Sequence, residues 1–401
     1  MWDREEPMDP AAAIPPAGEP VVPPAGRTSS LHFLNRVVFG AGAVDRLGEL
    51  ARALKTSRAL VVTDPGVRAA GHAERAARSL WREKVQPFVF DGVDENPTTR
   101  HVEEGSRFAG AQRVDLIVGL GGGSAMDTAK GINFLLTNGG RMEDYWGSDL
   151  AQRPMLPSLG VPTTAGTGSE AQSYALIEQE GSRVKMACGD RKARFHAVVL
   201  DPDLTATAPR RVTAAAGMDA VGHAVESYVT ARGDARSRSF AAGAWKLLEE
   251  SFEGSLAADP GLEVRGRMLL GAHLAGVAIE LSMLGAAHAC ANPLTSRYEV
   301  AHGAAVLLLL PHVIRYNEPA AAALYSELWG IVPPERRAGA LADRIEAMRR
   351  AGGLPGRLRD VPVPPEVLPD LAREAAQQWT ATFNPRPVTE ADLLGLYEAA
   401  F

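Results

Sequence analysis

The stretch that decides the fold is Asp115-Leu-Ile-Val-Gly-Leu-Gly-Gly-Gly-Ser-Ala-Met-Asp-Thr-Ala-Lys130. A hydrophobic run passes through consecutive glycines straight into a helical pattern that begins near Ser124. Glycines let backbone N–H groups approach a pyrophosphate closely, and the positive end of the following helix attracts its charge. The stretch therefore predicts a strand, a phosphate-binding turn and a helix. It matches neither G-x-G-x-x-G nor the Walker pattern, so a tight turn without a ligand is the alternative.

Comparable runs lie on both sides of this stretch. Between residue 31 and about residue 200, short aliphatic runs alternate with longer amphipathic stretches, which is typical of a mostly parallel sheet with connecting helices. The runs expected to form strands are residues 59–63, 85–90, 115–119, 156–162 and 195–200. Turn residues follow the first three runs, so those strand ends are expected to face a ligand crevice.

A second turn-rich segment is Pro162-Thr-Thr-Ala-Gly-Thr-Gly-Ser-Glu170. Its Thr163, Thr164, Thr167 and Ser169 hydroxyls could bind a ribose or the nicotinamide amide. The alternative is a helix cap built from Ser and Thr. Two loops of this kind on one sheet edge favour a dinucleotide.

Asp64 ends the 59–63 run. Its carboxylate could accept a hydrogen bond from an adenosine-ribose hydroxyl and would repel a 2′-phosphate, so NAD is expected over NADP. Aspartate is also common in turns for local reasons.

The third set of residues has the composition of a metal site. Asp219 and His223 stand four apart in a helical pattern, so both side chains leave the same face. Together with His288 and His302 they would form a four-ligand site for Fe(II) or Zn(II). A single histidine is more often a core or capping residue, as expected for the other five and for His312. Glu226 lies on the Asp219 face, where it either ligates or braces the site or is an exposed or capping carboxylate.

Residues after Asp201-Pro202 are rich in Ala, Leu, Glu and Arg with apolar spacings of three or four, which predicts helices to the C-terminus. We therefore expect a disordered Pro/Ala-rich tail (1–27), an NAD-binding α/β domain (28–208) and a helical metal-binding domain (209–401). The active site is expected in a cleft between the two domains.

Composition excludes several protein classes. The 401 residues are 46% hydrophobic and 22% charged, which fits neither a fibre nor a disordered chain. The net charge of -6 and the absence of a basic cluster argue against nucleic acid. No apolar run reaches the ~20 residues of a membrane span. Two cysteines and an acidic start, unlike that of a secretory signal, lead us to expect a cytoplasmic protein.

The sequence resembles the iron-containing (group III) alcohol dehydrogenases of the dehydroquinate synthase-like superfamily. The resemblance rests on the motifs 121–130, 162–170, 217–226, 288–302, Leu310-Pro-His312 and Asn384-Pro-Arg-Pro387. It implies an N-terminal Rossmann-like α/β domain followed by an all-helical C-terminal domain. The implied metal ligands are Asp219, His223, His288 and His302. The implied cofactor contacts are Asp64, Asn96, Gly122, Gly123, Ser124, Thr163, Thr164, Thr167 and Lys185, with Tyr174 near the nicotinamide.

One residue departs from the family pattern. Many relatives carry a histidine four residues after the position of His288, often proposed to move the proton, whereas this chain has Asn292. An amide cannot relay a proton at ordinary pH. Either water and the cofactor ribose carry the proton or the substrate differs; Asn292 capping a turn before Pro293 is the structural alternative.

The expected function is a metal-dependent, NAD-linked oxidoreductase that interconverts a small primary alcohol and its aldehyde by hydride transfer. The alternatives on the same fold are a hydroxyacid-oxoacid transhydrogenase and a dehydroquinate synthase-like lyase. A non-catalytic alternative, a cofactor-binding assembly protein, would require that the four metal-site residues occur together by chance. The resemblance also implies a homodimer.

Overall fold

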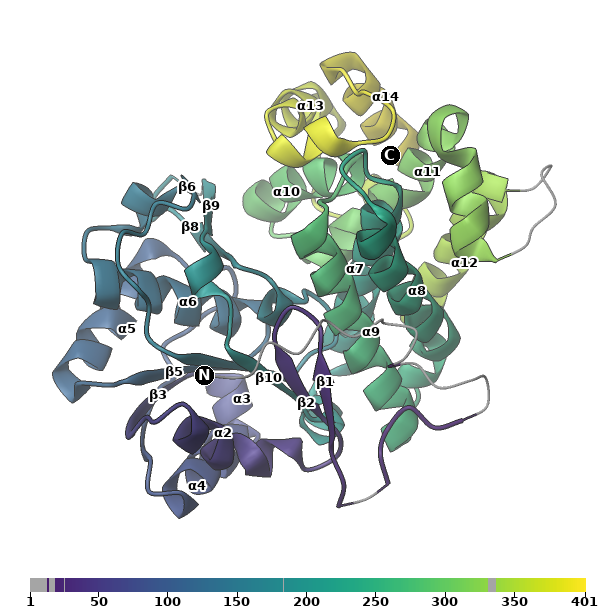
Figure 1. Cartoon of the computed structure of the whole chain (residues 1–401). Helices are drawn as coiled ribbons and strands as arrows, with labels where there is room; N and C mark the ends of the chain where they lie inside the picture. The colour runs from purple at the N-terminus through teal and green to yellow at the C-terminus, as the bar shows by residue number, and fades with distance from the viewer. Residues whose placement is uncertain (1–12, 14–18, 25, 183, 331–336) are drawn as a thin grey trace. The chain divides into compact units, whose positions relative to one another are not determined.

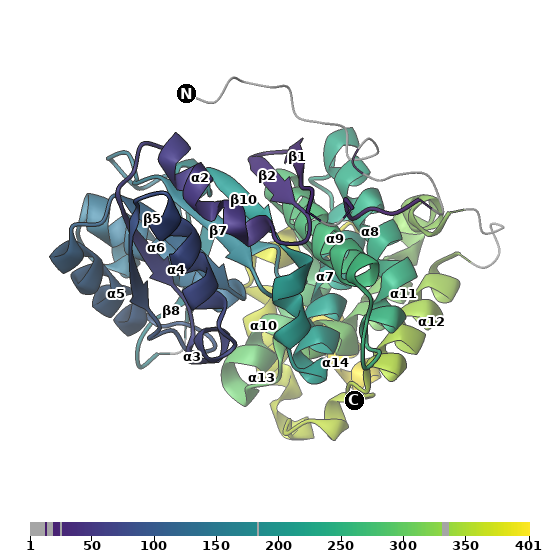
Figure 2. The ribbon, with the colours of Figure 1, turned by 90° about the horizontal axis from the view of Figure 1, so that it is seen from below.

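The computed structural model describes residues 13, 19–24, 26–182, 184–330 and 337–401. The chain forms two compact units, Met1–Ala208 and Pro209–Phe401 (Figures 1 and 2). Most of the predicted tail, residues 1–27, lies outside the described residues. Within its described part, Val21 and Val22 are buried.

A seven-stranded sheet forms the centre of the N-terminal unit, in the order β1-β2-β10-β7-β5-β3-β4. Its strands are β1 (Ser29–His32), β2 (Arg36–Phe39), β3 (Arg58–Val62), β4 (Gln86–Phe90), β5 (Leu116–Gly121), β7 (Ser158–Pro162) and β10 (Ala197–Leu200). Only the β1–β2 pairing in this sheet is antiparallel. The five predicted strands are confirmed as β3, β4, β5, β7 and β10. Strands β1 and β2 were not predicted.

Helices cover both faces of this sheet. They are α2 (Leu47–Ala53), α3 (Pro65–Ala69), α4 (His72–Arg82), α5 (Thr99–Gln112) and α6 (Gly123–Asn138). Helices α5 and α6 pack together on one face, and α2 and α4 pack on the other (Figure 1). Strand β5 is buried along its whole length, which explains why its sequence is continuously apolar rather than alternating.

A three-stranded sheet of order β6-β9-β8 accompanies the large one. It consists of β6 (Gly147–Ser148), β8 (Tyr174–Glu178) and β9 (Lys185–Gly189). The short helices of the unit are η1 (Ala43–Arg46), η2 (Met142–Tyr145), η3 (Ser169–Ala171), η4 (Arg191–Ala193) and η5 (Pro202–Thr207).

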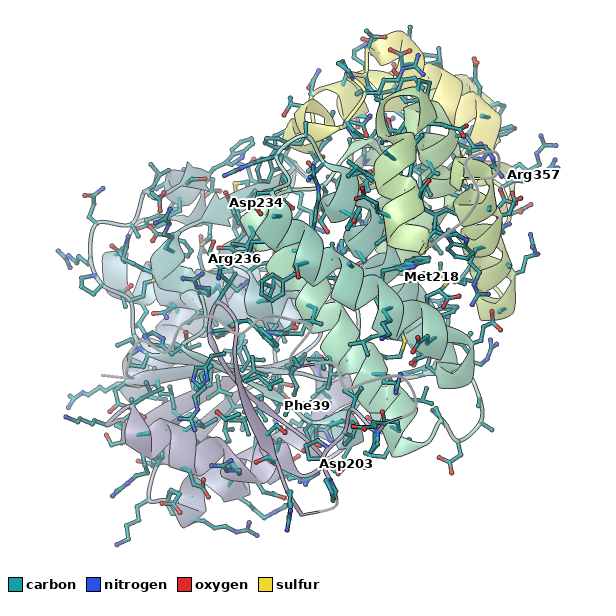
Figure 3. The ribbon with its side chains drawn as sticks, turned by 45° about the vertical axis from the view of Figure 1, so that its right-hand side comes forward. Phe39, Asp203, Met218, Asp234, Arg236 and Arg357 are labelled. Carbon is teal, nitrogen blue, oxygen red and sulfur yellow. The ribbon has the colours of Figure 1, made fainter. Side chains whose placement is uncertain are left out.

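The described part of the C-terminal unit is helical, as predicted. It contains α7 (Arg210–Val229), α8 (Ala235–Ser255), α9 (Leu262–Leu281), α10 (Ala286–Tyr298), α11 (His302–Trp329), α12 (Arg337–Gly352), α13 (Leu368–Ala376) and α14 (Glu390–Ala400), with the turns η7 (Leu358–Asp360), η8 (Pro365–Val367) and η9 (Trp379–Phe383). Asp234, labelled in Figure 3, begins α8, and its Oδ1 accepts a hydrogen bond from the Ser237 N–H at 2.7 Å. Thr389 and Asp392 form the capping box of α14, at the predicted helix start.

Helix α7 is the central element of this unit, because it packs against α8, α9 and α11. Every residue of α7 from Gly217 to Val229 is buried. A helix buried on all sides has no amphipathic pattern, and its polar residues must find partners inside the protein. No single helix in the described ranges is long and apolar enough to cross a membrane, although the bent pair α9 and α10 meets the length and composition criteria together.

Candidate metal centre and nucleotide-binding loops

The four predicted metal ligands meet around one carboxylate oxygen of α7. Asp219 Oδ1 lies 3.6 Å from His223 Nε2, 3.7 Å from His288 Nε2 and 3.8 Å from His302 Nε2. The ligand atoms of Asp219, His288 and His302 all lie within 4.8 Å of one another. A tetrahedral site with ligand bonds of roughly 2.0–2.2 Å needs neighbouring ligand atoms about 3.3–3.6 Å apart. The cluster therefore has the dimensions of a divalent metal site.

Local sequence explains why the four side chains converge. The four-residue spacing places Asp219 and His223 on one face of α7, one turn apart. Gly222 leaves room for His288, since a Cβ there would lie 2.6 Å from Val306 Cγ1 and 3.4 Å from His288 Cε1. At Gly303 a Cβ would collide with the α7 backbone, so this glycine lets the first turn of α11 approach α7. That approach brings the preceding His302 to Asp219.

The donor atoms fit a cation. Among the described residues, Asp219 Oδ1 and His288 Nε2 are buried without a hydrogen-bond partner. Each unpaired buried polar group costs about 1–3 kcal/mol, and a cation within the cluster would satisfy both. The His302 side chain is 30% exposed whereas the other three are 3–6% exposed, so solvent reaches the cluster on the His302 side.

Electrostatics favour positive charge at the same place. Burial alone would raise the pKa of Asp219, but the neighbouring imidazoles outweigh it and lower the pKa below the usual aspartate range. Burial likewise disfavours the charged form of His288, yet the neighbouring carboxylates of Asp219 and Glu226 raise its pKa to about 9. Neutral imidazole and ionised carboxylate are the forms that bind metal, so a cation would replace the proton of His288.

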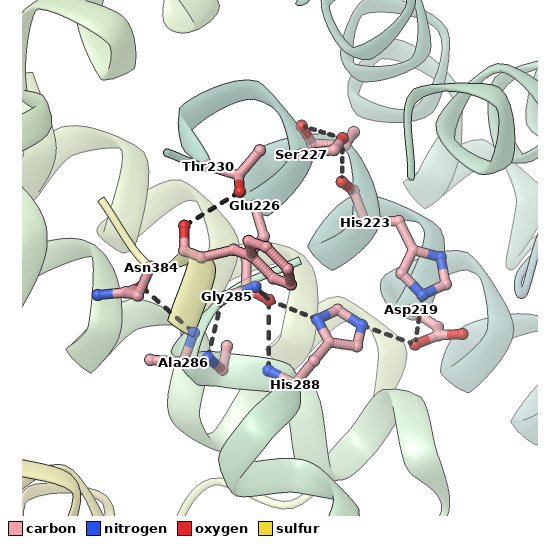
Figure 4. Close-up of polar contacts among 12 residues, drawn as sticks. Asp219, His223, Glu226, Ser227, Thr230, Gly285, Ala286, His288 and Asn384 are labelled. Atoms are coloured by element: carbon pink, nitrogen blue, oxygen red, sulfur yellow. Dashed lines mark hydrogen bonds and ion pairs between the residues drawn. The ribbon is translucent and has the colours of Figure 1, made fainter. Parts of the chain in front are cut away.

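A second carboxylate, Glu226, lies behind His288 (Figure 4). Its Oε2 is 2.5 Å from His288 Nδ1, and it accepts the Gly285 N–H at 3.1 Å and the His288 N–H at 3.3 Å. Its Oε1 accepts the Ala287 N–H at 2.8 Å. Among the roles left open for Glu226, its contacts support bracing and capping, whereas an exposed position is excluded because the residue is 3% exposed. These hydrogen bonds outweigh burial and lower its pKa.

Asn384 completes the cap of α10. Its Oδ1 accepts the Ala286 N–H at 3.2 Å, and its amide exchanges hydrogen bonds with Asn317. The sequence singled out the Asn384 motif without assigning it a role. The partners lie 67 to 98 residues apart along the chain, and no local pattern reveals such pairs.

In the N-terminal unit, the two predicted nucleotide loops lie against each other. Gly121 at the end of β5 pairs with Pro162 of β7, and Gly121 O accepts the Thr163 N–H at 2.9 Å. A Cβ at Gly123 would lie 2.8 Å from Thr167 Cγ2. Both loops therefore leave the carboxyl ends of adjacent parallel strands, where α/β sheets bind ligands. The short helix η3 begins after Gly168, and Thr167 Oγ1 accepts the Ser169 N–H at 3.3 Å, so Thr167 also supports the start of this helix.

The remaining predicted cofactor residues surround this edge. Asp64 is the N-cap of α3, and Gly122 is the N-cap of α6 with Ser124 in its first turn. Thr164 Oγ1 would lie 3.5 Å from a Cβ on Gly122, and Asp64 Oδ2 would lie 3.3 Å from one on Gly121. Both side chains therefore face the glycine turn.

Three predicted residues lie on or beside the small sheet. Lys185 at the start of β9 donates from Nζ to Asn96 Oδ1 at 3.4 Å. Tyr174 at the start of β8 lies 3.1 Å through its hydroxyl from Ser148 Oγ, and its ring covers Gly189, where a Cβ would not fit.

Sequence reasoning missed a buried lysine beneath the nucleotide loops. Lys130 of α6 is 1% exposed, and its Nζ donates to Ser169 O at 2.8 Å, Ser169 Oγ at 2.9 Å and Tyr174 O at 2.6 Å. Asp127, one turn earlier, accepts from Ser169 Oγ at 2.6 Å and lies 3.7 Å from the lysine. The Asp-x-x-Lys spacing in an otherwise apolar helix was the available signal, since an unpaired buried lysine is rarely tolerated.

Asn292 lies inside α10, and its Nδ2 donates to Gln378 Oε1 at 3.0 Å. The alternative that Asn292 caps a turn before Pro293 is wrong, because the helix continues through both residues to Tyr298.

Comparisons with known proteins agree with this architecture. Residues 35–202 match the model of iron-containing alcohol dehydrogenase, and residues 213–401 match that of the Fe-containing alcohol dehydrogenase family, C-terminal. The NAD-dependent methanol dehydrogenase of Bacillus methanolicus is 31% identical over 370 residues, covering 90% of this chain and 97% of that protein. The 1,3-propanediol dehydrogenase of Klebsiella pneumoniae is 32% identical, covering 90% and 96%.

A solved 1,3-propanediol oxidoreductase superimposes with a TM-score of 0.87 at 32% identity, covering 91% of this chain and 97% of that structure. This confirms the predicted fold class, an α/β domain followed by a helical one. Since both halves match the family models and the relatives match almost end to end, the chain belongs to the iron-containing alcohol dehydrogenase family.

Proposed function

We propose that this protein is an NAD-dependent, metal-assisted alcohol dehydrogenase that interconverts a small primary alcohol and its aldehyde. The observation that carries the proposal is the position of Asp219 Oδ1, 3.6–3.8 Å from three imidazole nitrogens within a buried cluster. The names of the relatives, which include an NAD-dependent methanol dehydrogenase and a 1,3-propanediol dehydrogenase, support the reaction class.

Asp219, His223, His288 and His302 would hold the metal, Fe²⁺ or Zn²⁺. When bound, such an ion acts as a Lewis acid that lowers the pKa of an alcohol hydroxyl. One carboxylate and three neutral imidazoles leave the site with net positive charge, which favours the deprotonated alcohol over the neutral one. The exposed side of His302 supports substrate entry there.

The N-terminal unit would hold NAD, which accepts the hydride. Gly122, Gly123 and Ser124 offer backbone N–H groups and the positive end of α6 to the pyrophosphate. Thr163, Thr164 and Thr167 line the facing loop. These six residues form the proposed phosphate and sugar contacts.

Three further residues complete the proposed cofactor site. The Asp64 carboxylate at the glycine turn would repel a 2′-phosphate and favours NAD over NADP. Asn96 and Lys185, which contact each other, would contribute polar contacts. Their proximity supports a shared contact with one polar group of the cofactor.

Two residues are proposed near the reacting atoms. Tyr174 would offer its ring to the nicotinamide. Asn292 cannot relay a proton, and its amide is engaged by Gln378, so water and the cofactor ribose would carry the proton to solvent.

Residues 28–208 would thus be the NAD-binding domain and residues 209–401 the metal-binding domain. We further propose a cytoplasmic homodimer with no nucleic-acid or membrane partner. Two buried free cysteines support a reducing compartment, and the net charge of -6 argues against nucleic acid. Light scattering of the purified protein tests the dimer.

The decisive assay uses chelator-stripped protein reloaded with Fe²⁺ or Zn²⁺ and given short primary alcohols with NAD or NADP. We expect NADH to accumulate steadily and only with metal. His288→Ala and His302→Ala should abolish turnover, whereas His312→Ala, on α11 outside the cluster, should retain it. Turnover by metal-free protein would refute the metal's role. Hydride exchange between a hydroxy acid and an oxo acid without NADH release would indicate the transhydrogenase instead.

A further inference from the structure

The hydrogen bonds around Glu226 define how His288 is protonated. Both Glu226 oxygens receive backbone N–H groups: Oε1 from Ala287, and Oε2 from Gly285 and His288 (Figure 4). Three backbone N–H groups point at this carboxylate and favour its ionised form, because that form only accepts hydrogen bonds. The 2.5 Å contact from His288 Nδ1 to Oε2 must then be an N–H donated by the imidazole.

This arrangement leaves the other nitrogen of the ring toward the cluster. With the proton fixed on Nδ1, the neutral ring carries its lone pair on Nε2, which lies 3.7 Å from Asp219 Oδ1. Nε2 is also one of the buried atoms without a hydrogen-bond partner among the described residues. A metal-binding imidazole needs a lone pair at this position, and its second nitrogen usually donates to a carboxylate or carbonyl.

Glu226 also holds the backbone that carries the ring. Its carboxylate caps the N-terminus of α10, so the same group fixes both the position of residue 288 and the rotation of its side chain. A negative charge is favourable at this helix end. The carboxylate packs directly against the start of α10, because a Cβ on Gly285 would lie 2.9 Å from Glu226 Oε1.

We propose that Glu226 is a positioning residue of the metal site, which selects the Nδ1–H tautomer of His288 and so prepares Nε2 to bind the cation. This inference rests on the proposed metal site. Asn384 caps the same helix through Ala286 but makes no hydrogen bond to His288 among the described contacts. Substituting Asn384 therefore removes a cap of α10 without removing a hydrogen bond to the imidazole, which distinguishes the capping role from the orienting role.

The test measures zinc affinity of the full-length apoprotein by competition with a chromophoric chelator. Glu226→Gln should weaken zinc binding about 10- to 100-fold. Asn384→Ala, which also removes a cap, should stay within about threefold of wild type. Glu226→Gln binding zinc like wild type would overturn the inference, as would equal losses in both variants. Wild type that binds no zinc would refute the proposed metal site itself, and the inference with it.

A second measurement needs no variant and covers the case in which Glu226→Gln fails to fold. Zinc-loaded wild type labelled with ¹⁵N-histidine reports the tautomer of each ring by NMR. We expect His288 to carry its proton on Nδ1, with the proton resonance shifted downfield by the carboxylate, and to carry none on Nε2. A proton on Nε2 would overturn the inference.

Discussion

Lys130 offers the sharpest test of how the nucleotide loops are held. Lys130→Met keeps the aliphatic volume but removes the ammonium group that donates to Ser169 O, Ser169 Oγ and Tyr174 O. Asp127 would remain buried without its cation. Removing one partner of a buried ion pair costs about 3–5 kcal/mol. At about 2–4 °C per kcal/mol for a unit of this size, the melting temperature should fall by roughly 6–20 °C.

The loss should depend on pH. Burial raises the pKa of Asp127, and Lys130 partly offsets this, so the variant should raise the folded-state pKa of Asp127 further above that of an ordinary aspartate. A carboxyl whose pKa is raised on folding binds its proton more tightly in the folded state, so its contribution to stability falls as pH rises. Lys130→Met should therefore lose more stability relative to wild type at pH 8 than at pH 5.

Differential scanning calorimetry of the whole protein at both pH values measures this. Lys192→Met is the matched control, because Lys192 also pairs with an aspartate, Asp190, but its side chain is 39% exposed. Asp190 is buried but keeps the N–H groups of Ala151 and Lys192 as partners, so losing the exposed ammonium should cost only about 0–1 kcal/mol. The reasoning is refuted if Lys130→Met and Lys192→Met have the same melting temperature and Lys130→Met shows no added pH dependence. The buried lysine then does not hold the loops.

Three further predictions concern other parts of the chain. Burial raises the pKa of Cys188 to about 12 and also raises that of Cys290, so Ellman's reagent should label neither thiol in the native protein and both after unfolding; rapid native labelling would contradict this. Gly285→Ala should lower stability by about 1–3 kcal/mol in denaturant titrations, because its Cβ displaces the oxygens that cap α10, whereas Gly261→Ala, with nothing within 4 Å, should not. Asp64→Asn keeps an acceptor for the α3 cap but removes the charge, so the ratio of kcat/KM for NAD over NADP should fall; an unchanged ratio would exclude a role in cofactor choice.

The sequence alone predicts the elements whose signal is local. Strands β3, β5 and β10 are buried on both sides, so continuous aliphatic runs reveal them. Strands β1 and β8 are only partly buried, and their mixed composition resembles loop sequence. The alternative of a turn at Asn292-Pro293 was wrong because a tertiary setting can accommodate proline within a helix.

The candidate site likewise contains residues that the sequence predicts and residues whose roles it does not reveal. The four-residue spacing predicts that Asp219 and His223 share a helix face, and the structure brings His288 and His302 to them. The role of Glu226 could not be predicted, since its partners lie about sixty residues away and its contacts depend on how α7 meets α10. Long-range hydrogen bonds of buried polar groups leave no periodic trace in a sequence.

The cap that Asn384 gives to α10 sets an order on biosynthesis. A nascent chain folds from its N-terminus as it is made, and Asn384 follows Ala286 by 98 residues. Tyr397 of α14 also donates its hydroxyl proton to Cys290 O of α10, at 2.7 Å. Helix α10 therefore gains these two supports only after α14 has been synthesised. A ribosome stalled before Asn384, or a protease that removes residues 384–401, would leave α10 capped by Glu226 but without them.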